Sequence, residues 1–357
     1  MREAGLYKKL PRCLVQCCLC RHFCRLSENQ RGLCGVRQNQ AGLLVSLNYG
    51  RLIARAVDPV EKKPLFHFLP GTAAYSIAAV GCNLCCANCQ NWQISQGIKE
   101  SKNPRPDFAS GTRGVRQENN FLFPGDDVSV QEVVAEAVES GCRSIAYTYT
   151  EPTIFFEYAL DCMKLARQHS LKNIWVSNGY MSKDCLNEIL PWLDAINVDL
   201  KFFDEQIYWQ NCGCHLAPIL ENLQRLAKAG VNLEVTTLLV PGQTDKLDQL
   251  GDIADFIATE LSPDVPWHIS KFSPEISYLL QSYQPTPAGL IDAAYEAGLK
   301  AGLSYVYTGN LLNDGRENTY CPCCRALVIR RRAYEITNYS LAGQCHKCGY
   351  QLPLKFE

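Results

Sequence analysis

The sequence has no long hydrophobic run and almost no net charge. No stretch approaches the roughly 18 apolar residues that a membrane-spanning helix needs. At the N-terminus, Pro11 and Arg12 come before any apolar segment of the kind found in a secretory leader. The 35 basic and 36 acidic side chains leave a formal charge of −1, which argues against long nucleic acid as a partner held by bulk electrostatics. We therefore expect a cytoplasmic protein that binds no membrane and is not built for nucleic acid.

The composition is that of a folded metal protein. Hydrophobic residues make up 47% of the chain and charged residues 20%, which excludes disorder as a description of the whole. The 357 residues allow about two domains, or one large α/β domain with small additions. Fifteen of the 20 cysteines lie within 13–34, 82–89 and 321–348. A disulfide scaffold is normally shorter, with cysteines spread along it, so the clusters favour metal–thiolate sites in a reducing compartment.

The middle of the chain alternates between strand and helix patterns. Short apolar, β-branched runs predict strands at 74–79, 144–149, 173–177, 195–200, 232–240, 267–272 and 303–307. Apolar residues at three- and four-residue spacing predict helices at 130–139, 154–168, 183–190, 217–229, 247–259 and 288–301. This alternation predicts parallel strands with crossover helices. Six or seven such units fall short of a closed eight-fold barrel, so we expect an incomplete parallel (β/α) barrel over 73–310.

Two smaller pieces flank the predicted barrel. Residues 1–72 hold the first cysteine cluster and two alternating runs, 42–49 and 51–57, which predict a hairpin. Residues 311–357 hold the last cluster. Within the barrel, the proline- and glycine-broken segment 101–128 predicts a long loop of open role.

A dense cysteine motif follows the first predicted barrel strand. Residues 81–92 are GCNLCCANCQNW, and Cys82, Cys86 and Cys89 form the spacing C-x3-C-x2-C. A cubic iron–sulfur cluster normally takes four cysteines, so three thiolates leave one iron open to another ligand. Zinc held by three thiolates and water, or buried thiols without metal, are the alternatives.

This motif resembles the radical S-adenosylmethionine (SAM) superfamily. More closely, the chain resembles the AmmeMemoRadiSam branch, which is related to the activating enzymes of pyruvate formate-lyase. Beyond residues 81–92, the resemblance is carried by ordered segments at 17–24, 34–37, 58–64, 147–152, 177–180, 199–201, 240–242, 265–268, 306–310 and 318–321.

The resemblance implies a catalytic [4Fe-4S] cluster on Cys82, Cys86 and Cys89, with SAM chelating the fourth iron. One electron from a reductant such as flavodoxin or ferredoxin would cleave SAM to methionine and a 5′-deoxyadenosyl radical, which abstracts hydrogen. Implied contacts of SAM are Glu151, Asn178, Gly179, Asp199, Lys201 and His268. Without the resemblance, a glutamate before a proline at a helix start and a lone histidine would be ordinary structural residues.

One position departs from the superfamily pattern. The residue before the last motif cysteine is usually aromatic and packs on adenine, but here it is Asn88. Stacking would then come from elsewhere, and Trp92 is the nearest candidate. Cys85 lies where most relatives have no thiol.

The last cysteine cluster has the spacing of a zinc ribbon. Two C-x2-C pairs, separated by 20 residues, are joined by strand-like stretches: Cys321 and Cys324, then Cys345 and Cys348. A module this small has too little core to fold alone, so bound metal would supply its folding energy. Residues 330–332, three arginines, could contact nucleic acid, although a solvated face is the simpler interpretation.

The first cysteine cluster is ambiguous. Cys17, Cys20, Cys24 and Cys34 could hold zinc or an auxiliary iron–sulfur cluster, and spacing does not decide between them. Zinc is favoured slightly, because no sequence feature marks a route for electrons. The pair in Cys212-Gly213-Cys214 is interpreted as a turn with two ordinary thiols.

Three functional hypotheses follow. The first is a radical SAM enzyme that abstracts hydrogen from a protein or peptide, as in glycyl-radical activation or side-chain modification; the resemblance implies Ammecr-like and Memo-like partner proteins. The second is radical SAM modification of tRNA or another RNA. The third is a non-catalytic zinc-binding scaffold.

Overall fold

A mostly parallel sheet of eight strands organises the middle of the chain. The computed structural model describes residues 1–99, 123–311 and 314–357. The strand order is β16-β15-β14-β13-β12-β11-β9-β8, with β8 antiparallel to β9 and every other pairing parallel. The strands are β8 (Ala54–Pro59), β9 (Ala73–Ala78), β11 (Ser144–Tyr147), β12 (Lys172–Ser177), β13 (Ala195–Asp199), β14 (Asn232–Leu239), β15 (Trp267–Lys271) and β16 (Val306–Gly309). The predicted incomplete parallel barrel is confirmed.

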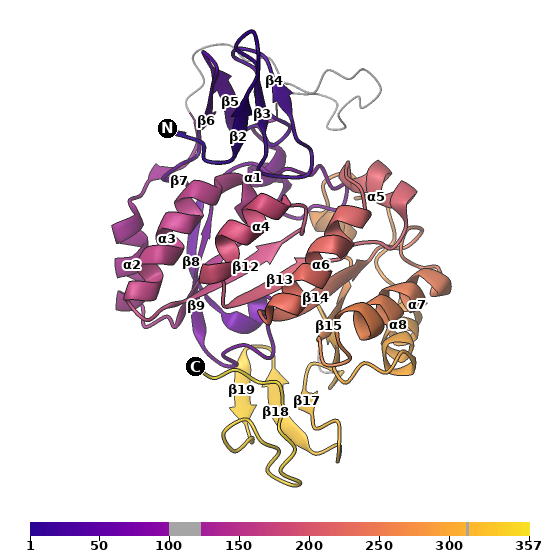
Figure 1. Ribbon diagram of the computed structural model, residues 1–357. Helices are drawn as coiled ribbons and strands as arrows, with labels where there is room; N and C mark the ends of the chain where they lie inside the picture. Colours follow the sequence, from indigo (N-terminus) through magenta and orange to yellow (C-terminus); the bar gives the residue numbers. More distant parts are fainter. Residues whose placement is uncertain (100–122, 312–313) are drawn as a thin grey trace.

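Helices cover the outer face of this sheet (Figure 1). They are α2 (Val130–Glu139), α3 (Phe156–Gln168), α4 (Lys183–Ile189), α6 (Ala217–Ala229), α7 (Leu247–Phe256) and α8 (Ala288–Lys300). Two other helices, α1 (Trp92–Gln96) and α5 (Glu205–Cys212), lie at the end of the barrel that faces the N-terminal cysteine segment. The main hydrophobic core fills the space between helices and sheet. No helix within the described residues is long and apolar enough to cross a membrane.

The N-terminal segment forms small sheets at one end of the barrel (Figure 1). One has the order β1-β6-β5 and another β2-β3-β4, while β7 pairs with β10. Their bounds are β1 (Arg2–Glu3), β2 (Tyr7–Lys9), β3 (Val15–Cys17), β4 (Arg25–Leu26), β5 (Arg37–Gln40), β6 (Leu43–Ser46), β7 (Arg51–Leu52) and β10 (Asp126–Asp127). The predicted hairpin of 42–49 with 51–57 is wrong, because β6 pairs with β5 and β1, and β8 joins the barrel sheet instead.

The C-terminal module closes the opposite end of the barrel (Figure 1). It is a three-stranded sheet of β17 (Thr319–Tyr320), β18 (Leu327–Arg332) and β19 (Glu335–Asn338) with a small core of its own. A second cluster of buried apolar residues between 60 and 69 packs on the first residues of the barrel strands and fills this end from within. The end of the barrel where the parallel strands finish is not filled by these residues.

The predicted loop at 101–128 lies mostly outside the described residues. Its last part is described and leads through β10 into α2, which begins at the predicted cap Ser129 with Glu132 as its capping-box partner.

Candidate active site

The cysteine loop leaves the carboxyl end of β9 and passes directly beneath the N-terminal segment. Gly81, at φ +102°, makes this approach possible. A Cβ built on Gly81 would lie 2.7 Å from the carbonyl oxygen of Cys34 and 2.8 Å from Val36 Cγ1, closer than any side chain tolerates. The start of the motif is therefore held against the first cysteine cluster.

Each motif thiol has a neighbour that orients it. The amide of Leu84 points at Cys82 Sγ (3.4 Å), and Cys89 Sγ lies 3.3 Å from Ser95 Oγ on α1. The thiol of Cys212 is hydrogen-bonded to Cys86, which lowers the pKa of Cys86 to about 7 despite its burial. Burial raises the pKa of Cys82 and of Cys89.

The spacing of these thiols suits a cluster better than a single ion. Within the described residues, the one group of three or more potential ligands whose atoms all lie within 4.8 Å of one another is in the C-terminal module. The thiols of Cys82, Cys86 and Cys89 are therefore more widely spread, as expected when iron and sulfide stand between them. Three thiols on one loop at the carboxyl end of the first parallel strand fit a [4Fe-4S] cluster with one open iron.

Two other segments support the cysteine loop through its backbone. The amides of Cys85 and Ala87 donate to the carbonyls of Cys212 (3.0 Å) and Asn211 (2.9 Å) at the end of α5. From the loop after β15, Leu279 donates its amide to Ala87 O at 2.9 Å, and Ser277 donates its hydroxyl to the same atom at 3.1 Å. The turn predicted at 212–214 is present, since Gly213 at φ +72° ends α5, and its carbonyls also anchor the motif.

Glu151 and Asn178 follow the next two strands and meet above them. The Glu151 carboxylate is 1% exposed and accepts hydrogen bonds from Thr153, from Ser177 Oγ (2.9 Å) and from the Asn178 amide (2.8 Å). Burial raises the pKa of Glu151, and these donors oppose that rise in part. The side-chain amide of Asn178 donates to Asn83 Oδ1 (2.8 Å) and lies 3.9 Å from Cys82 Sγ, so both residues border the cysteine loop.

Asp199 and Lys201 form an ion pair at the end of β13. Lys201 Nζ lies 2.7 Å from Asp199 Oδ2, and the Lys201 backbone amide donates to the hydroxyl of Tyr208 at 2.9 Å. Burial lowers the pKa of Lys201, but the charges of Asp199 and Cys86 outweigh it and the net pKa is raised. A fixed positive charge therefore faces Cys86.

The backbone conformation and the packing at Gly179, just after β12, both require a glycine. Its φ is +72°, and a Cβ there would lie 2.9 Å from Val198 Cγ1 and 3.2 Å from Ile219 Cγ2. Its carbonyl accepts a hydrogen bond from Asn222 at 2.8 Å. The residue must be glycine for packing alone, whether or not a ligand passes over it.

The structure corrects the role expected for His268, because its ring does not lie with the other predicted SAM contacts. It is the second residue of β15, at the end where strands begin, whereas Cys82, Glu151, Asn178 and Lys201 follow strand ends. Its ring donates to Glu234 (2.7 Å), stacks on Tyr307 and meets the edge of Phe66. The ring is enclosed at the end of the barrel covered by the C-terminal module. The predicted strand at 267–272 already placed His268 near its start, so the implied contact with SAM did not agree with the strand pattern.

Aromatic and amide groups complete the surroundings of the cysteine loop. Trp92 stacks on Tyr278 with ring centroids 5.3 Å apart and planes at 20°. Tyr278 lies close enough to Cys85 and Cys89 for their charges to raise its pKa together with burial. Asn88 Oδ1 is buried and has no hydrogen-bond partner among the described residues. Tyr278, Ser277 and Cys212 were missed from sequence because each lies more than 100 residues from the motif.

The terminal cysteine groups have different geometries. In the C-terminal module, Cys321 Sγ and Cys348 Sγ are 3.6 Å apart, as are Cys324 Sγ and Cys345 Sγ, and all four lie within 4.8 Å of one another. A tetrahedral ion with metal–sulfur bonds of about 2.3 Å puts its sulfurs about 3.8 Å apart, so this group fits one metal ion.

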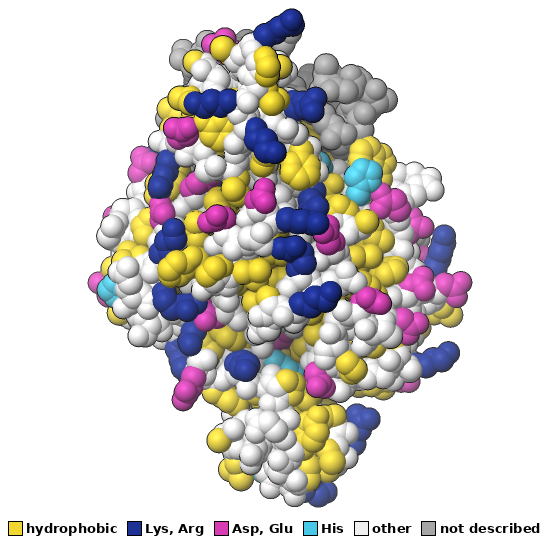
Figure 2. Space-filling model, in the orientation of Figure 1, with side chains coloured by type: hydrophobic (Ala, Val, Ile, Leu, Met, Phe, Trp, Pro, Cys, Tyr) yellow, Lys and Arg dark blue, Asp and Glu magenta, His cyan; other side chains and the backbone are white. Residues whose placement is uncertain are grey.

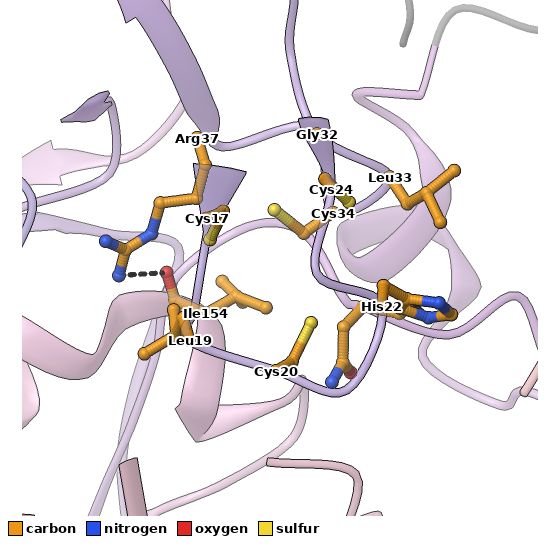
Figure 3. A pocket seen from close by; sticks show the side chains of 11 residues that line it. Cys17, Leu19, Cys20, His22, Cys24, Gly32, Leu33, Cys34, Arg37 and Ile154 are labelled. Carbon is orange, nitrogen blue, oxygen red and sulfur yellow. Dashed lines mark hydrogen bonds between the residues drawn. The ribbon is translucent and has the colours of Figure 1, made fainter. Parts of the chain in front are cut away.

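The N-terminal group lines a cavity. Its wall includes all four predicted ligands, Cys17, Cys20, Cys24 and Cys34, together with Asn83 of the cysteine loop. Figure 3 shows the four thiols around one space.

The chain is similar to known proteins over its whole length. A family model described as "Radical SAM superfamily" matches residues 76–257, just over half of the chain and including all three motif cysteines. "Uncharacterized protein MJ0808" of Methanocaldococcus jannaschii is 37% identical over 362 aligned residues, covering 99% of each chain. The "(2S)-3-sulfopropanediol dehydratase activating enzyme" of Klebsiella oxytoca is 24% identical over 143 residues, 38% of this chain and 45% of that protein.

Solved structures show more distant similarity. A domain of a pyruvate-formate lyase-activating enzyme from Bacteroides vulgatus is 17% identical, covers 47% of this chain and 99% of its own, and has a TM-score of 0.41. Streptococcus suis SuiB bound to S-adenosylmethionine is 10% identical, covers 70% of this chain and 53% of its own, and has a TM-score of 0.47.

Proposed function

The chain belongs to the radical SAM superfamily, and from this premise we propose that it abstracts hydrogen from a protein or peptide substrate. The observation that carries the proposal is the set of three thiols, Cys82, Cys86 and Cys89, on one loop at the carboxyl end of β9. A one-electron donor of the flavodoxin or ferredoxin class would serve as reductant, because radical SAM enzymes need one.

The three thiols would hold a [4Fe-4S] cluster whose fourth iron binds SAM. Together, the bound cluster and SAM supply a 5′-deoxyadenosyl radical after one-electron cleavage of the sulfonium. Two residues favour the thiolate form of Cys86. The Cys212 thiol hydrogen-bonds to it, and the positive charge of Lys201 faces it. The carbonyls of Asn211 and Cys212 accept backbone hydrogen bonds from the loop and would hold the loop in place around a bound cluster.

Polar groups at the strand ends would orient SAM. Glu151 is a buried carboxylate, and an ammonium group arriving beside it would favour its charged form. Lys201 suits the SAM carboxylate, and Asp199 holds the lysine in place at 2.7 Å. Asn178 and Gly179 would line the path between these groups. The stacked pair of Trp92 and Tyr278 offers the aromatic surface that Asn88 does not provide.

Within the superfamily, we assign the chain to the AmmeMemoRadiSam branch, with Ammecr-like and Memo-like proteins as partners. The support is the order of motifs described above, from the first cysteine cluster to residues 318–321. For the C-terminal module, we propose zinc as the metal, because four thiolates in tetrahedral spacing are a common structural zinc site.

The RNA-modification alternative is weakened, although Arg330 and Arg332 are exposed. It depended on three consecutive arginines in the C-terminal module as a docking surface. Arg331 is only 2% exposed and donates to the Phe66 carbonyl at 2.7 Å inside the end of the barrel. Figure 2 shows acidic and basic side chains interspersed over the face in view, in keeping with the net charge of −1.

Anaerobic reconstitution tests the proposed chemistry. With dithionite, the wild type should convert SAM to 5′-deoxyadenosine, and Cys86→Ala should abolish the conversion. Cys85→Ala is the matched control: it removes the neighbouring buried thiol, which the motif does not use, and should keep the iron content and the product. Unchanged product from Cys86→Ala, or none from the wild type with its cluster in place, would contradict the proposal.

The substrate class needs a separate test. Proteins captured from the source cells by the reconstituted enzyme are added in deuterium-labelled form together with SAM. Deuterium should enter 5′-deoxyadenosine when the true substrate is present. Transfer from purified tRNA, but from none of the captured proteins, would overturn the protein-substrate assignment in favour of RNA.

A further inference from the structure

The cavity in the N-terminal segment is lined by four cysteines of the first cysteine cluster. Cys17 ends β3, Cys20 and Cys24 follow on the next turn, and Cys34 arrives from the loop before β5. Three of the four are less than 9% exposed. In Figure 3 the thiols surround a common space rather than pairing with one another. Four thiols around one cavity, three of them on buried residues, are a candidate metal site.

The spacing of the thiols argues against a single ion. Tetrahedral zinc needs sulfurs about 3.8 Å apart, and the C-terminal group meets that requirement, with pairs at 3.6 Å. Within the described residues, no three potential ligand atoms outside the C-terminal group lie within 4.8 Å of one another, so the N-terminal thiols are more widely spaced than those of the C-terminal group. A cubic cluster places iron and sulfide between the thiolates, which then stand on the order of 6 Å apart.

The cavity wall also suits an iron–sulfur cluster. Leu19, Leu33 and Ile154 make it apolar, as expected for a group that is kept from water. Arg37 lines it as well, and its Nε is buried without a hydrogen-bond partner among the described residues. That N–H is therefore available to a sulfur of the cluster, and hydrogen bonds to sulfur are one of the means by which proteins tune cluster potentials.

The cavity lies next to the barrel site. Asn83 lines it and is the residue after Cys82. His22, another wall residue, donates from Nε2 to the Asn83 carbonyl at 2.8 Å. On the other side of Cys82, Gly81 packs on the carbonyl of Cys34. Two metal groups placed at these sites would therefore be direct neighbours, with only the segment around Asn83 between them.

We propose that Cys17, Cys20, Cys24 and Cys34 hold a second iron–sulfur cluster, which relays single electrons to the barrel site. In one cycle the cluster accepts one electron from a donor of the ferredoxin or flavodoxin class and passes it on, returning to its oxidised state with no bond made or broken. The identity of this cluster stands independently of the proposed function, whereas its relay role rests on that function.

Metal content tests the identity of the cluster in the full chain. The triple variant Cys82→Ala/Cys86→Ala/Cys89→Ala leaves the N-terminal group intact. We expect it to retain about four irons with matching sulfide, against about eight in the wild type, and a Mössbauer spectrum of a cluster. A triple variant that holds two zincs and no iron would overturn the proposal.

The converse variant, Cys20→Ala/Cys34→Ala, should lose about four irons and keep the barrel cluster. Its matched control is Cys13→Ala/Cys18→Ala, which removes two nearby thiols that do not line the cavity and should keep all the iron. Equal iron in the wild type and in the Cys20→Ala/Cys34→Ala variant, both correctly folded, would refute the assignment.

Electron paramagnetic resonance tests the relay. In the reduced wild type, two clusters this close should give a broadened, spin-coupled signal, and each deletion variant should give an uncoupled one. A wild-type spectrum equal to the sum of the two variant spectra would contradict the relay. If the triple variant and the wild type carry the same iron and the same signal, the proposed function fails while the second cluster stands.

Discussion

A buried ion pair ties the N-terminal segment to the barrel, and breaking it should be costly. Arg37 of β5 donates from both terminal nitrogens to the Glu157 carboxylate of α3, at 2.6 and 2.5 Å. The side chains are 1% and 8% exposed. Glu157 also accepts the amide of Gly5 at 3.0 Å. The substitution Glu157→Gln keeps the size of the side chain but leaves the guanidinium buried without its counter-ion.

Removing one partner of a buried pair costs about 3–5 kcal/mol, because the remaining charge cannot be solvated. We therefore expect Glu157→Gln to lower the free energy of unfolding by that amount. Urea unfolding at fixed metal content, followed by tryptophan fluorescence, measures it. The double variant Arg37→Met/Glu157→Met should recover most of the loss, because apolar replacements of both partners are often neutral.

The pH dependence follows from the same pair. Burial raises the pKa of Glu157, but the charge of Arg37 outweighs it and the net pKa is lowered from 4.5. A carboxylate whose pKa is lower in the folded state than in the unfolded state stabilises the fold at pH values above its unfolded pKa. This contribution is lost as the pH falls through the folded-state pKa. The difference in unfolding free energy between the wild type and Glu157→Gln should thus be full at neutral pH and shrink below about pH 4.5.

An exposed pair provides the control. Arg316 Nη1 and Asp292 Oδ1 are also 2.6 Å apart, but the side chains are 29% and 59% exposed. Exposed pairs contribute about 0–1 kcal/mol, so Asp292→Asn should change stability little. If Glu157→Gln cost no more than Asp292→Asn, the reasoning from burial would be refuted.

Three further predictions concern the two ends of the barrel. Lys201→Met should weaken SAM binding about 10- to 100-fold, the worth of one charge-assisted hydrogen bond, as measured by equilibrium dialysis; unchanged affinity would remove Lys201 from the site. Cys345→Ser should remove the C-terminal metal while leaving iron unchanged, as measured by plasma emission, and loss of iron instead would contradict the zinc assignment. Arg331→Ala should destabilise the protein by about 3 kcal/mol, because the guanidinium hydrogen-bonds Phe66 and Thr319, and expose the C-terminal module to protease; unchanged protease resistance would contradict that role.

Local patterns were enough to predict most of the barrel. The helices at 130–139 and 217–229 have the predicted bounds, because a capping box begins the first and Gly230, at φ +72°, ends the second. The buried parallel strands appear in sequence as apolar runs. Helix α5 was missed, because it is short and its residues alternate little between apolar and polar. Its end at Cys212 nevertheless supports the cysteine loop.

Contacts between distant segments could not be predicted in the same way. The strand β8 looks like half of a hairpin, since its nearest neighbour in sequence is another short strand, yet it pairs with β9. The partner of His268, Glu234 on β14, could not be predicted, and one arginine of the C-terminal triplet, Arg331, turned out to be buried. In each case the deciding partner lies on another element, and composition or periodicity does not encode that partner.

The positions of the two terminal cysteine groups imply different roles for them. The N-terminal group meets the barrel where the strands end, with Cys34 packed on Gly81 beside the motif. The C-terminal module contacts the barrel at the end where the strands begin. Arg331 and the hydrogen bond between Thr319 and Tyr307 make this contact. A metal at the first position would lie beside the cysteine loop, whereas a metal at the second would lie beyond the buried apolar residues between 60 and 69. Redox chemistry is therefore favoured at one end of the barrel and structural support at the other.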